Sequence, residues 1–171
     1  VVAETDQIED LTDAATLDGL TGLYAREIFD SWLARSVAES KRYGDPLSLL
    51  MMDIDDFKMI NDTHGHQVGD QILETIGSEV RGNLRSADFA ARYGGEELAA
   101  VLPHTKIHSA HTVAEKIRRA IRERFAGNYG VTISVGGALW RNDMSGPNDL
   151  VEAADKALYA SKKAGKDRVV F

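Results

Sequence analysis

Hydrophobic residues recur along the chain at two different spacings, and each spacing predicts its own kind of element. Spacings of three and four residues place apolar side chains on one side of a helix. They predict helices over about 25–43, 66–84, 106–124 and 148–164. Continuous apolar or β-branched runs predict strands over 47–52, 131–140 and 167–171, with two further extended runs inside 88–102. Residues 1–17 are acidic, and their few apolar positions fit either a helix face or a frayed tail: Ile8, Leu11 and Ala15.

From residue 47 onward the predicted order is strand, helix, two strands, helix, strand, helix, strand. This order indicates an α+β fold, an α/β sandwich in which helices flank a mostly antiparallel central sheet. The first four strands and two helices match the ferredoxin-like β-α-β-β-α-β pattern, whose first strand lies antiparallel beside the third. Asp53, at the end of the first strand, would then meet the start of the strand after Gly95, where Glu96 lies.

The two extended runs within 88–102 are separated by Gly94-Gly95 and predict a β-hairpin, whose tight turn needs positive φ at both glycines. Glu96 and Glu97 follow at once and, as consecutive strand residues, point to opposite faces. One can face a site while the other is held by a different partner. A bare, acidic hairpin tip suits a nucleotide with a divalent cation, although an ordinary solvated turn has the same pattern.

Composition narrows the classes of function. The chain has 171 residues, which fits one domain or one domain with an appendage, and no cysteine, which excludes disulfides and thiolate metal sites. Its formal net charge of −7 argues against broad nucleic-acid binding, which needs a basic surface. No apolar run approaches the roughly 20 residues of a membrane span. Because the chain does not begin with Met, we expect it to be a fragment of a longer protein.

Three carboxylates carry the candidate metal chemistry. Asp53, Glu96 and Glu97 are hard oxygen donors without an imidazole or thiol nearby, which favours Mg²⁺ or Mn²⁺ over zinc. Each could instead be a salt-bridged surface residue, but that explanation is weaker for Asp53, which ends a buried apolar strand. Two carboxylates on adjacent strands, together with substrate phosphate oxygens, can hold two metals around one phosphorus.

Polar residues after the first strand have the chemistry of a nucleotide site. The turn at Phe57-Lys58 can hold phosphates with its backbone N–H groups and the lysine charge. Asn61 can donate to a guanine ring nitrogen. Asp70 can accept from guanine's N1–H and amine, or can lie at a helix terminus as a dipole partner. His66 fits a ligand, a base or, more simply, a helix start.

Other charged positions are ambiguous when taken alone. Lys162 and Lys166 can bind a triphosphate or can stabilise the end of the last helix, and Gly165 between them is typical of a C-cap. Arg85 and Asp88 form an Arg-x-x-Asp unit, for which a local ion pair is the default interpretation.

Taken together, these stretches resemble the GGDEF family of diguanylate cyclases over nearly the whole chain. The matching segments are Asp18–Leu23, Pro46–Leu50, Asp53–Lys58, Asn61–His66, Gly69-Asp70, Ala91–Leu98, Val131–Gly136 and Ala154–Tyr159. The resemblance implies a core related to nucleotidyl cyclases and polymerase palms. It also implies that two GTP molecules are condensed into cyclic di-GMP and two pyrophosphates by metal-assisted attack of a 3′-hydroxyl on an α-phosphate, with product inhibition.

The resemblance also implies roles for individual residues. The metal ligands, for Mg²⁺ or Mn²⁺ with two ions per active site, would be Asp53, Glu96 and the Ile54 carbonyl. The catalytic residues would be Asp53, Lys58, Glu96 and Glu97. The substrate-binding residues would be Phe57, Lys58, Asn61, His66, Asp70, Gly94, Gly95, Lys162 and Lys166. An inhibitory product site would contain Arg85, Asp88 and Lys116.

Four positions depart from the family pattern. Leu98 replaces a usual Phe, which changes packing rather than chemistry, and Ala25 replaces a frequent Asn. Lys166 replaces a common Arg and keeps the charge without the fork geometry. Lys116 stands where a second inhibitory-site Arg is frequent, so we expect weaker product inhibition.

The domain division expected from the resemblance is a linker or signalling-helix remnant over 1–17 and the GGDEF catalytic domain over 18–171. The implied partners are GTP, cyclic di-GMP and an upstream sensor or regulatory domain. Each active site holds one GTP, so catalysis needs a homodimer, which can be transient. Neither a nucleic-acid partner nor a membrane segment in this chain is expected. The implied location is the cytoplasm, as the output domain of a longer protein that is itself free or membrane-attached.

Three alternatives stand beside an active cyclase. A degenerate member would bind GTP or cyclic di-GMP without catalysis, but such members typically lose the Gly-Gly-Glu-Glu residues kept here at 94–97. An enzyme that makes a mixed GMP-AMP dinucleotide is disfavoured by Asp70, whose carboxylate matches guanine's paired donors. The third alternative is a signalling or dimerisation module whose carboxylates are only surface groups.

Overall fold

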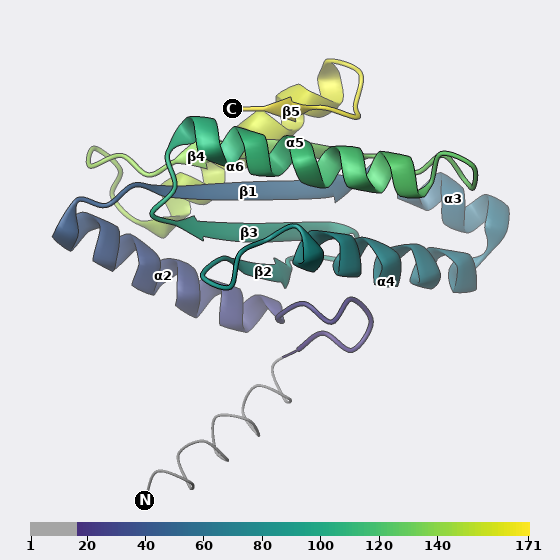
Figure 1. The fold of residues 1–171 in the computed structure, drawn as a ribbon, viewed down its shortest axis with the longest axis horizontal. Coiled ribbons are helices and arrows are strands. Elements are labelled where there is room, and N and C mark those ends of the chain that lie inside the picture. The colour runs from purple at the N-terminus through teal and green to yellow at the C-terminus, as the bar shows by residue number, and fades with distance from the viewer. Residues whose placement is uncertain (1–16) are drawn as a thin grey trace, which may run out of the picture.

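A five-stranded sheet organises the protein in this computed structural model, which describes residues 17–171 (Figure 1). Its strands are β1 (Leu47–Ile54), β2 (Phe89–Arg92), β3 (Glu97–Pro103), β4 (Ile133–Leu139) and β5 (Val169–Val170). The spatial order is β2-β3-β1-β4-β5, and neighbouring strands are antiparallel except β4 and β5, which pair in parallel. The predicted ferredoxin-like core, with its first strand antiparallel beside its third, is confirmed.

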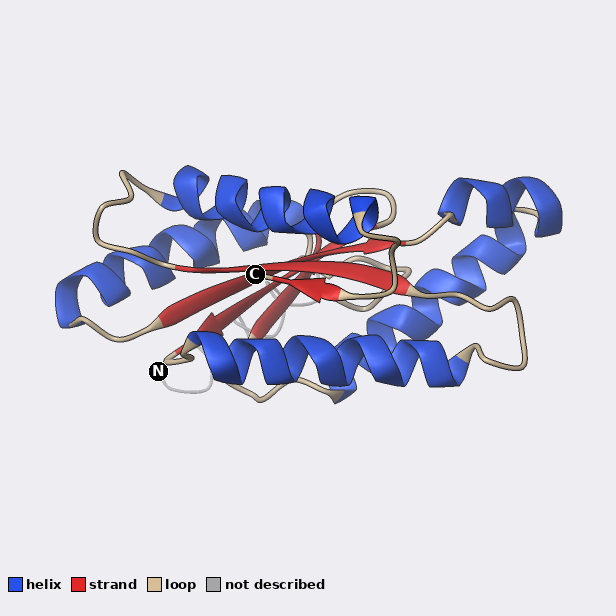
Figure 2. Ribbon diagram, turned by 90° about the horizontal axis from the view of Figure 1, so that it is seen from above, coloured by secondary structure: helices blue, strands red, loops and turns tan. Residues whose placement is uncertain are grey.

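Helices cover both faces of this sheet, as the edge-on view in Figure 2 shows. They are α2 (Arg26–Tyr43), α3 (Phe57–His64), α4 (His66–Gly82), α5 (Ile107–Arg124) and α6 (Pro147–Lys163). One apolar cluster joins α4 and α5 to the sheet, and a second joins α2 and α6 to the opposite face. The four helices predicted from apolar spacing correspond to α2, α4, α5 and α6.

Strand β1 is the centre of both clusters. All eight of its residues are buried, and alternate side chains enter opposite clusters: Leu50 and Met52 face α4 and α5, while Leu49 and Met51 face α2 and α6. A strand covered on both faces has a continuous apolar run, as predicted for this segment. Side chains at its end therefore project from a rigid base.

Helix α3 was not predicted as an element, because its segment is dense in polar residues. Only Phe57 and Ile60 are buried in its eight residues, which is too short a pattern to indicate a helix. Gly65 then separates α3 from α4 with a φ of 90°, a conformation that glycine adopts without a Cβ penalty.

The hairpin between β2 and β3 exists, but the predicted turn was wrong. Four residues, 93–96, connect the strands, and neither Gly94 nor Gly95 has a φ in the left-handed region. The backbone N–H groups of Tyr93 and Gly94 both donate to the Glu97 carbonyl, at 2.8 and 3.1 Å. A Cβ on Gly94 would lie 3.1 Å from Glu97 Oε2, so the Glu97 side chain would have to shift slightly to admit one.

The segment before α2 completes the edge of the sheet. The Tyr24 N–H donates to the Ala90 carbonyl at 3.1 Å, and the Tyr24 carbonyl accepts from the Arg92 N–H at 2.9 Å, so this residue extends the sheet beyond β2. The linker expected over 1–17 lies outside the described residues except for Leu17. Within residues 17–171, no helix has the length and apolar character that crossing a membrane requires.

Candidate active site

The candidate site lies where β1 ends beside the start of β3. Asp53 is paired in register with Glu97, so these two carboxylates lie on the sheet face that α2 and α6 cover. Glu96, one residue earlier, accepts the Ile54 N–H through its carbonyl at 3.2 Å. The sequence predicted convergence of Asp53 with the start of β3, which is confirmed; the residue directly opposite it is Glu97 rather than Glu96.

This carboxylate pair is electrostatically strained. Asp53 is 6% exposed, and burial raises the pKa of its carboxyl despite a salt bridge to Lys162, whose Nζ lies 2.7 Å from Oδ2. Burial also raises the pKa of Glu97, and the negative charges of Asp53 and Asp155 add to the shift. A cation placed between Asp53 and Glu97 would relieve both effects.

The predicted guanine-binding residues lie on α3 and α4. Asn61 on α3 has a buried Oδ1 without a hydrogen-bond partner among the described residues. A Cβ on Gly69 would lie 1.8 Å from this oxygen, so only glycine lets α4 approach so closely. Asp70 and His66 are exposed on α4. An unpaired buried amide is costly, and a ligand that hydrogen-bonds it would remove that cost.

The predicted phosphate-binding residues divide into two groups. Lys58 is exposed on α3, whereas the Phe57 ring belongs to the core, so only the Phe57 backbone is available to a ligand. Lys162 on α6 and Lys166 just after it are both engaged with carboxylates at the end of β1, the first with Asp53 and the second with Asp56. The structure thus brings both cations to the acidic end of the sheet.

Arg85 and Asp88, the Arg-x-x-Asp unit, form an ion pair with each other. The Nε and Nη2 atoms of Arg85 donate to the two carboxylate oxygens of Asp88 at 3.1 and 2.9 Å, and the Asp88 side chain is fully buried. The Arg85 guanidinium is 57% exposed and also donates to Thr105 Oγ1 at 2.7 Å. Lys116 lines a second cavity with Glu115 and Arg119, and Asn83, two residues before Arg85 in the chain, lines that same cavity.

A family model described as "Diguanylate cyclase, GGDEF domain" matches residues 15–168. The chain belongs to the GGDEF domain family. Diguanylate cyclase A of Treponema denticola is 40% identical over 168 residues, covering 94% of this chain and 45% of that protein. This chain therefore spans less than half the length of that relative.

Two solved structures are similar to this GGDEF domain over most of its length. The GGDEF domain of DgcB from Caulobacter crescentus, in complex with c-di-GMP, has a TM-score of 0.86 and 39% identity, covering 91% of this chain and 92% of that one. The diguanylate cyclase SiaD from Pseudomonas aeruginosa, in complex with its activator SiaC, has a TM-score of 0.91 and 35% identity, covering 99% of this chain and 66% of that one.

Diguanylate cyclases of the GGDEF family are generally metal-dependent, and the donor set here fits a hard cation. Asp53 and Glu97 lie opposite each other on adjacent strands, Glu96 precedes Glu97, and Ile54, with its backbone carbonyl, follows Asp53. Among residues 17–171, no three His, Cys, Asp or Glu side chains form a group that could hold a metal by themselves. Backbone and substrate oxygens would therefore have to complete the coordination.

Arg92 is a residue of this GGDEF domain whose role sequence reasoning missed. Its side chain donates to the carbonyls of Gly94 and Gly95, the latter at 2.8 Å, and its Nη1 lies 3.2 Å from Asp18 Oδ1. Asp18 in turn accepts the N–H and hydroxyl of Thr21. One arginine thus joins the hairpin tip to the entry turn, and an Arg two residues before a pair of turn glycines was the available signal.

Proposed function

We propose that this GGDEF domain is the catalytic part of a diguanylate cyclase, which condenses two GTP into cyclic di-GMP and two pyrophosphates. The observation that carries the proposal is the in-register pair of buried Asp53 and partly buried Glu97, with Lys162 bound to Asp53 and Lys166 bound to nearby Asp56. A relative that is named a diguanylate cyclase and aligns with 94% of this chain supports this proposal. The similarity does not favour a domain that only binds nucleotide.

Mg²⁺ or Mn²⁺, two ions per site, would be held by Asp53, Glu96 and the Ile54 carbonyl, with Glu97 in support. When bound, the metal would supply Lewis-acid stabilisation of the attacking 3′-hydroxyl and the leaving pyrophosphate. The protein's own contribution is to hold these oxygen donors on a strand that is buried along its whole length. Lys162 is paired with Asp53, so a metal ion bound by Asp53 would compete with this lysine. We infer that Lys162 then leaves the carboxylate and pairs with a substrate phosphate.

The nucleotide would be oriented from the α3–α4 side. Asn61 and Asp70 would hydrogen-bond the guanine edge, with His66 and the Gly94-Gly95 backbone lining the site. Lys58, Lys162 and Lys166 would neutralise the phosphates, with the backbone at Phe57 beside them. Because one site holds one GTP, two copies of the domain must meet face to face for the two 3′-hydroxyls to attack.

We also propose product inhibition through Arg85, because its guanidinium is more than half exposed and lines a cavity distinct from the carboxylate site. Asp88 would act mainly by orienting Arg85, since both of its oxygens already accept from that side chain. Lys116 supplies a single point charge in place of a second arginine fork, which agrees with an expectation of weak inhibition. An upstream segment or partner would control the domain, and residues 18–171 would form the catalytic unit.

The test is incubation of the purified chain with GTP and Mg²⁺, followed by chromatographic separation of the nucleotides. Cyclic di-GMP and pyrophosphate in a 1:2 ratio are expected, as the proposed reaction requires. ATP should be a poor substrate, because a site built to hydrogen-bond guanine leaves its groups unpaired with adenine. Binding of GTP without any turnover would contradict the proposal and would support a nucleotide-binding signalling module.

A further inference from the structure

The loop between α6 and β5 carries a predicted phosphate-binding residue in a backbone conformation that needs support from outside. Gly165, Lys166 and Asp167 have φ values of 118°, 64° and 44°. Residues with a Cβ rarely adopt this left-handed region, and they stay in it only where neighbouring groups hold them there. The position of Lys166 therefore depends on what fixes the loop.

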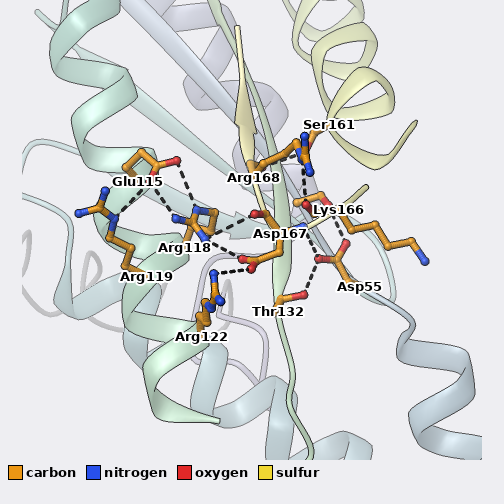
Figure 3. A network of polar contacts seen from close by, with 11 residues as sticks. Asp55, Glu115, Arg118, Arg119, Arg122, Thr132, Ser161, Lys166, Asp167 and Arg168 are labelled. Atoms are coloured by element: carbon orange, nitrogen blue, oxygen red, sulfur yellow. Dashed lines mark hydrogen bonds and ion pairs between the residues drawn. The ribbon is translucent and has the colours of Figure 1, made fainter. Parts of the chain in front are cut away.

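Asp167 anchors the loop to helix α5. Its Oδ1 accepts from Arg118 Nη1 at 2.7 Å, and its Oδ2 lies 3.0 Å from Arg122 Nη1. Arg118 is itself oriented by Glu115, which accepts from its Nε and Nη2 at 3.3 and 3.0 Å, and the Arg118 side chain is 11% exposed. Asp167 thus binds a guanidinium that is already held in place (Figure 3).

Asp55 fixes the same residue from the opposite side. Its Oδ2 accepts the Asp167 N–H at 3.1 Å, and its two oxygens also accept the hydroxyls of Thr132 and Ser134 at 2.7 and 2.6 Å. Asp55 follows Asp53 by two residues and is 6% exposed. The loop is therefore tied directly to the end of β1 that carries the candidate catalytic carboxylates.

Lys166 lies between these two anchors and keeps its charged end free of them. In Figure 3 its side chain extends away from the network around Asp167. Its N–H donates to the Ser161 carbonyl at 3.1 Å, and its Nζ pairs with Asp56, where the lysine side chain is 43% exposed. The contacts hold the backbone of Lys166 and leave the ammonium group able to exchange Asp56 for an anionic ligand.

We propose that Asp167, held by Arg118, is a positioning residue for nucleotide binding that acts through Lys166. It contacts no nucleotide itself; it fixes the backbone that presents the Lys166 ammonium group to the GTP phosphates. This rests on the proposed function, in which Lys166 binds those phosphates.

The sign of the effect separates positioning from simple electrostatics. Asp167 is negative, so removing its charge near a triphosphate would tighten nucleotide binding if only charge mattered, and it would leave Arg118 and Arg122 without that partner. Loss of positioning has the opposite effect, because the ammonium group is no longer held where the phosphates bind. Small displacements of a binding group are costly, so we expect binding to weaken about fivefold or more in Asp167→Ala.

The experiment uses the 171-residue chain and 3′-deoxy-GTP with Mg²⁺, since this analogue lacks the attacking hydroxyl and can be titrated calorimetrically without turnover. Asp167→Ala, Lys166→Ala and the double variant are compared, together with KM and kcat for GTP. We expect Asp167→Ala to raise Kd and KM with little change in kcat. The double variant should bind no more weakly than Lys166→Ala alone, because both changes remove one interaction.

Two further variants provide a surface control and a more conservative substitution at position 167. Asp143→Ala removes a carboxylate that pairs with Arg141 at 3.0 Å on the surface, with 64% and 71% of the two side chains exposed, and should leave Kd unchanged. Asp167→Asn keeps the side-chain size and tolerates positive φ, so it serves if Asp167→Ala does not fold, and a smaller rise in Kd is expected.

The outcomes distinguish the two proposals. An unchanged Kd in Lys166→Ala would remove the phosphate role of Lys166, and the positioning role of Asp167 with it. A weaker Kd in Lys166→Ala combined with unchanged or tighter binding in Asp167→Ala and Asp167→Asn overturns the positioning role alone. Additive losses in the double variant overturn it as well.

Discussion

Asp53 and Asp55 lie two residues apart at the end of β1, and each is 6% exposed, but their carboxylates are in opposite situations. Asp55 accepts two hydroxyls and one backbone N–H at 2.6 to 3.1 Å. Asp53 has a half-exposed lysine as its salt-bridge partner and lies beside Glu97, and burial raises the pKa of its carboxyl.

Equal burial therefore does not mean an equal role. A buried carboxylate whose oxygens are all satisfied by fixed donors stabilises the fold. A buried carboxylate that lies next to another one and is paired only with a partly exposed lysine is unfavourable until a ligand binds, which is typical of functional sites. The following variants test whether this distinction between Asp53 and Asp55 holds.

The largest expected effect is on turnover in Asp53→Asn. This change removes a proposed metal ligand while relieving the repulsion with Glu97, so we expect cyclic di-GMP formation to fall by about 100-fold or more. The free energy of unfolding should stay within about 1 kcal/mol of wild type, since breaking a strained pair with a half-exposed lysine costs little. Initial rates and urea unfolding measure the two quantities. Near wild-type turnover with Mg²⁺ would remove Asp53 from the site.

The reverse pattern is expected for Asp55→Ala. It leaves the hydroxyls of Thr132 and Ser134 and the Asp167 N–H without their acceptor, and each orphaned buried group costs about 1–3 kcal/mol. We expect a loss of about 2–4 kcal/mol in the free energy of unfolding. Asp143→Ala, at an exposed surface pair, is the matched control and should be neutral. An Asp55→Ala variant as stable as wild type would contradict the stabilising role that distinguishes Asp55 from Asp53.

The structure also shows which of these features a sequence can predict. The apolar run of β1 and the helical spacing in α4 are local patterns, so the sheet, its pairing and the convergence of Asp53 with β3 were predicted correctly. The turn at Gly94-Gly95 was not, because the Arg92 side chain that binds its carbonyls also pairs with Asp18, 74 residues earlier, and no local pattern indicates that contact.

The network around Asp167 is the clearest case of what the sequence does not reveal. Arg118 and Asp167 are 49 residues apart, and Asp55 and Asp167 are 112 apart. No local spacing connects them, and each appears in the sequence as an ordinary solvated charge. The metal and nucleotide roles of the site residues stay predictions, whereas their placement near the end of the central strand β1 is a property of the fold.

A smaller effect concerns a third carboxylate, Asp88, which resembles Asp55 in being fully satisfied, here by Arg85. Arg85→Ala should leave basal turnover intact and raise the inhibitory concentration of cyclic di-GMP about tenfold, as expected for one charged hydrogen-bonding group. Initial rates at increasing cyclic di-GMP measure the inhibitory concentration, and calorimetric titration of cyclic di-GMP into both proteins measures the change in affinity. Arg141→Ala, at the exposed surface pair with Asp143, is the control and should have little effect. Superimposable binding curves for wild type and Arg85→Ala would place the product site elsewhere.

The smallest expected effect is the pH dependence of stability caused by Glu97. Burial and the Asp53 charge raise the pKa of Glu97 above its ordinary value of 4.5, so the folded protein binds this proton more readily than the unfolded chain does. The stabilisation from that proton is complete below the pKa that Glu97 has in the unfolded chain, and it is lost as pH rises through the pKa that Glu97 has in the folded protein.

Wild type should therefore gain stability relative to Glu97→Gln as pH falls from 7 toward 4.5, in the absence of divalent metal. Urea unfolding of both proteins across this range measures the difference, and subtracting the variant cancels the titration of groups that do not interact with Glu97. Mg²⁺ at pH 7 should stabilise wild type more than Glu97→Gln, because the cation then replaces the proton. Parallel stability curves with and without Mg²⁺ would show that Glu97 is an ordinary solvated carboxylate.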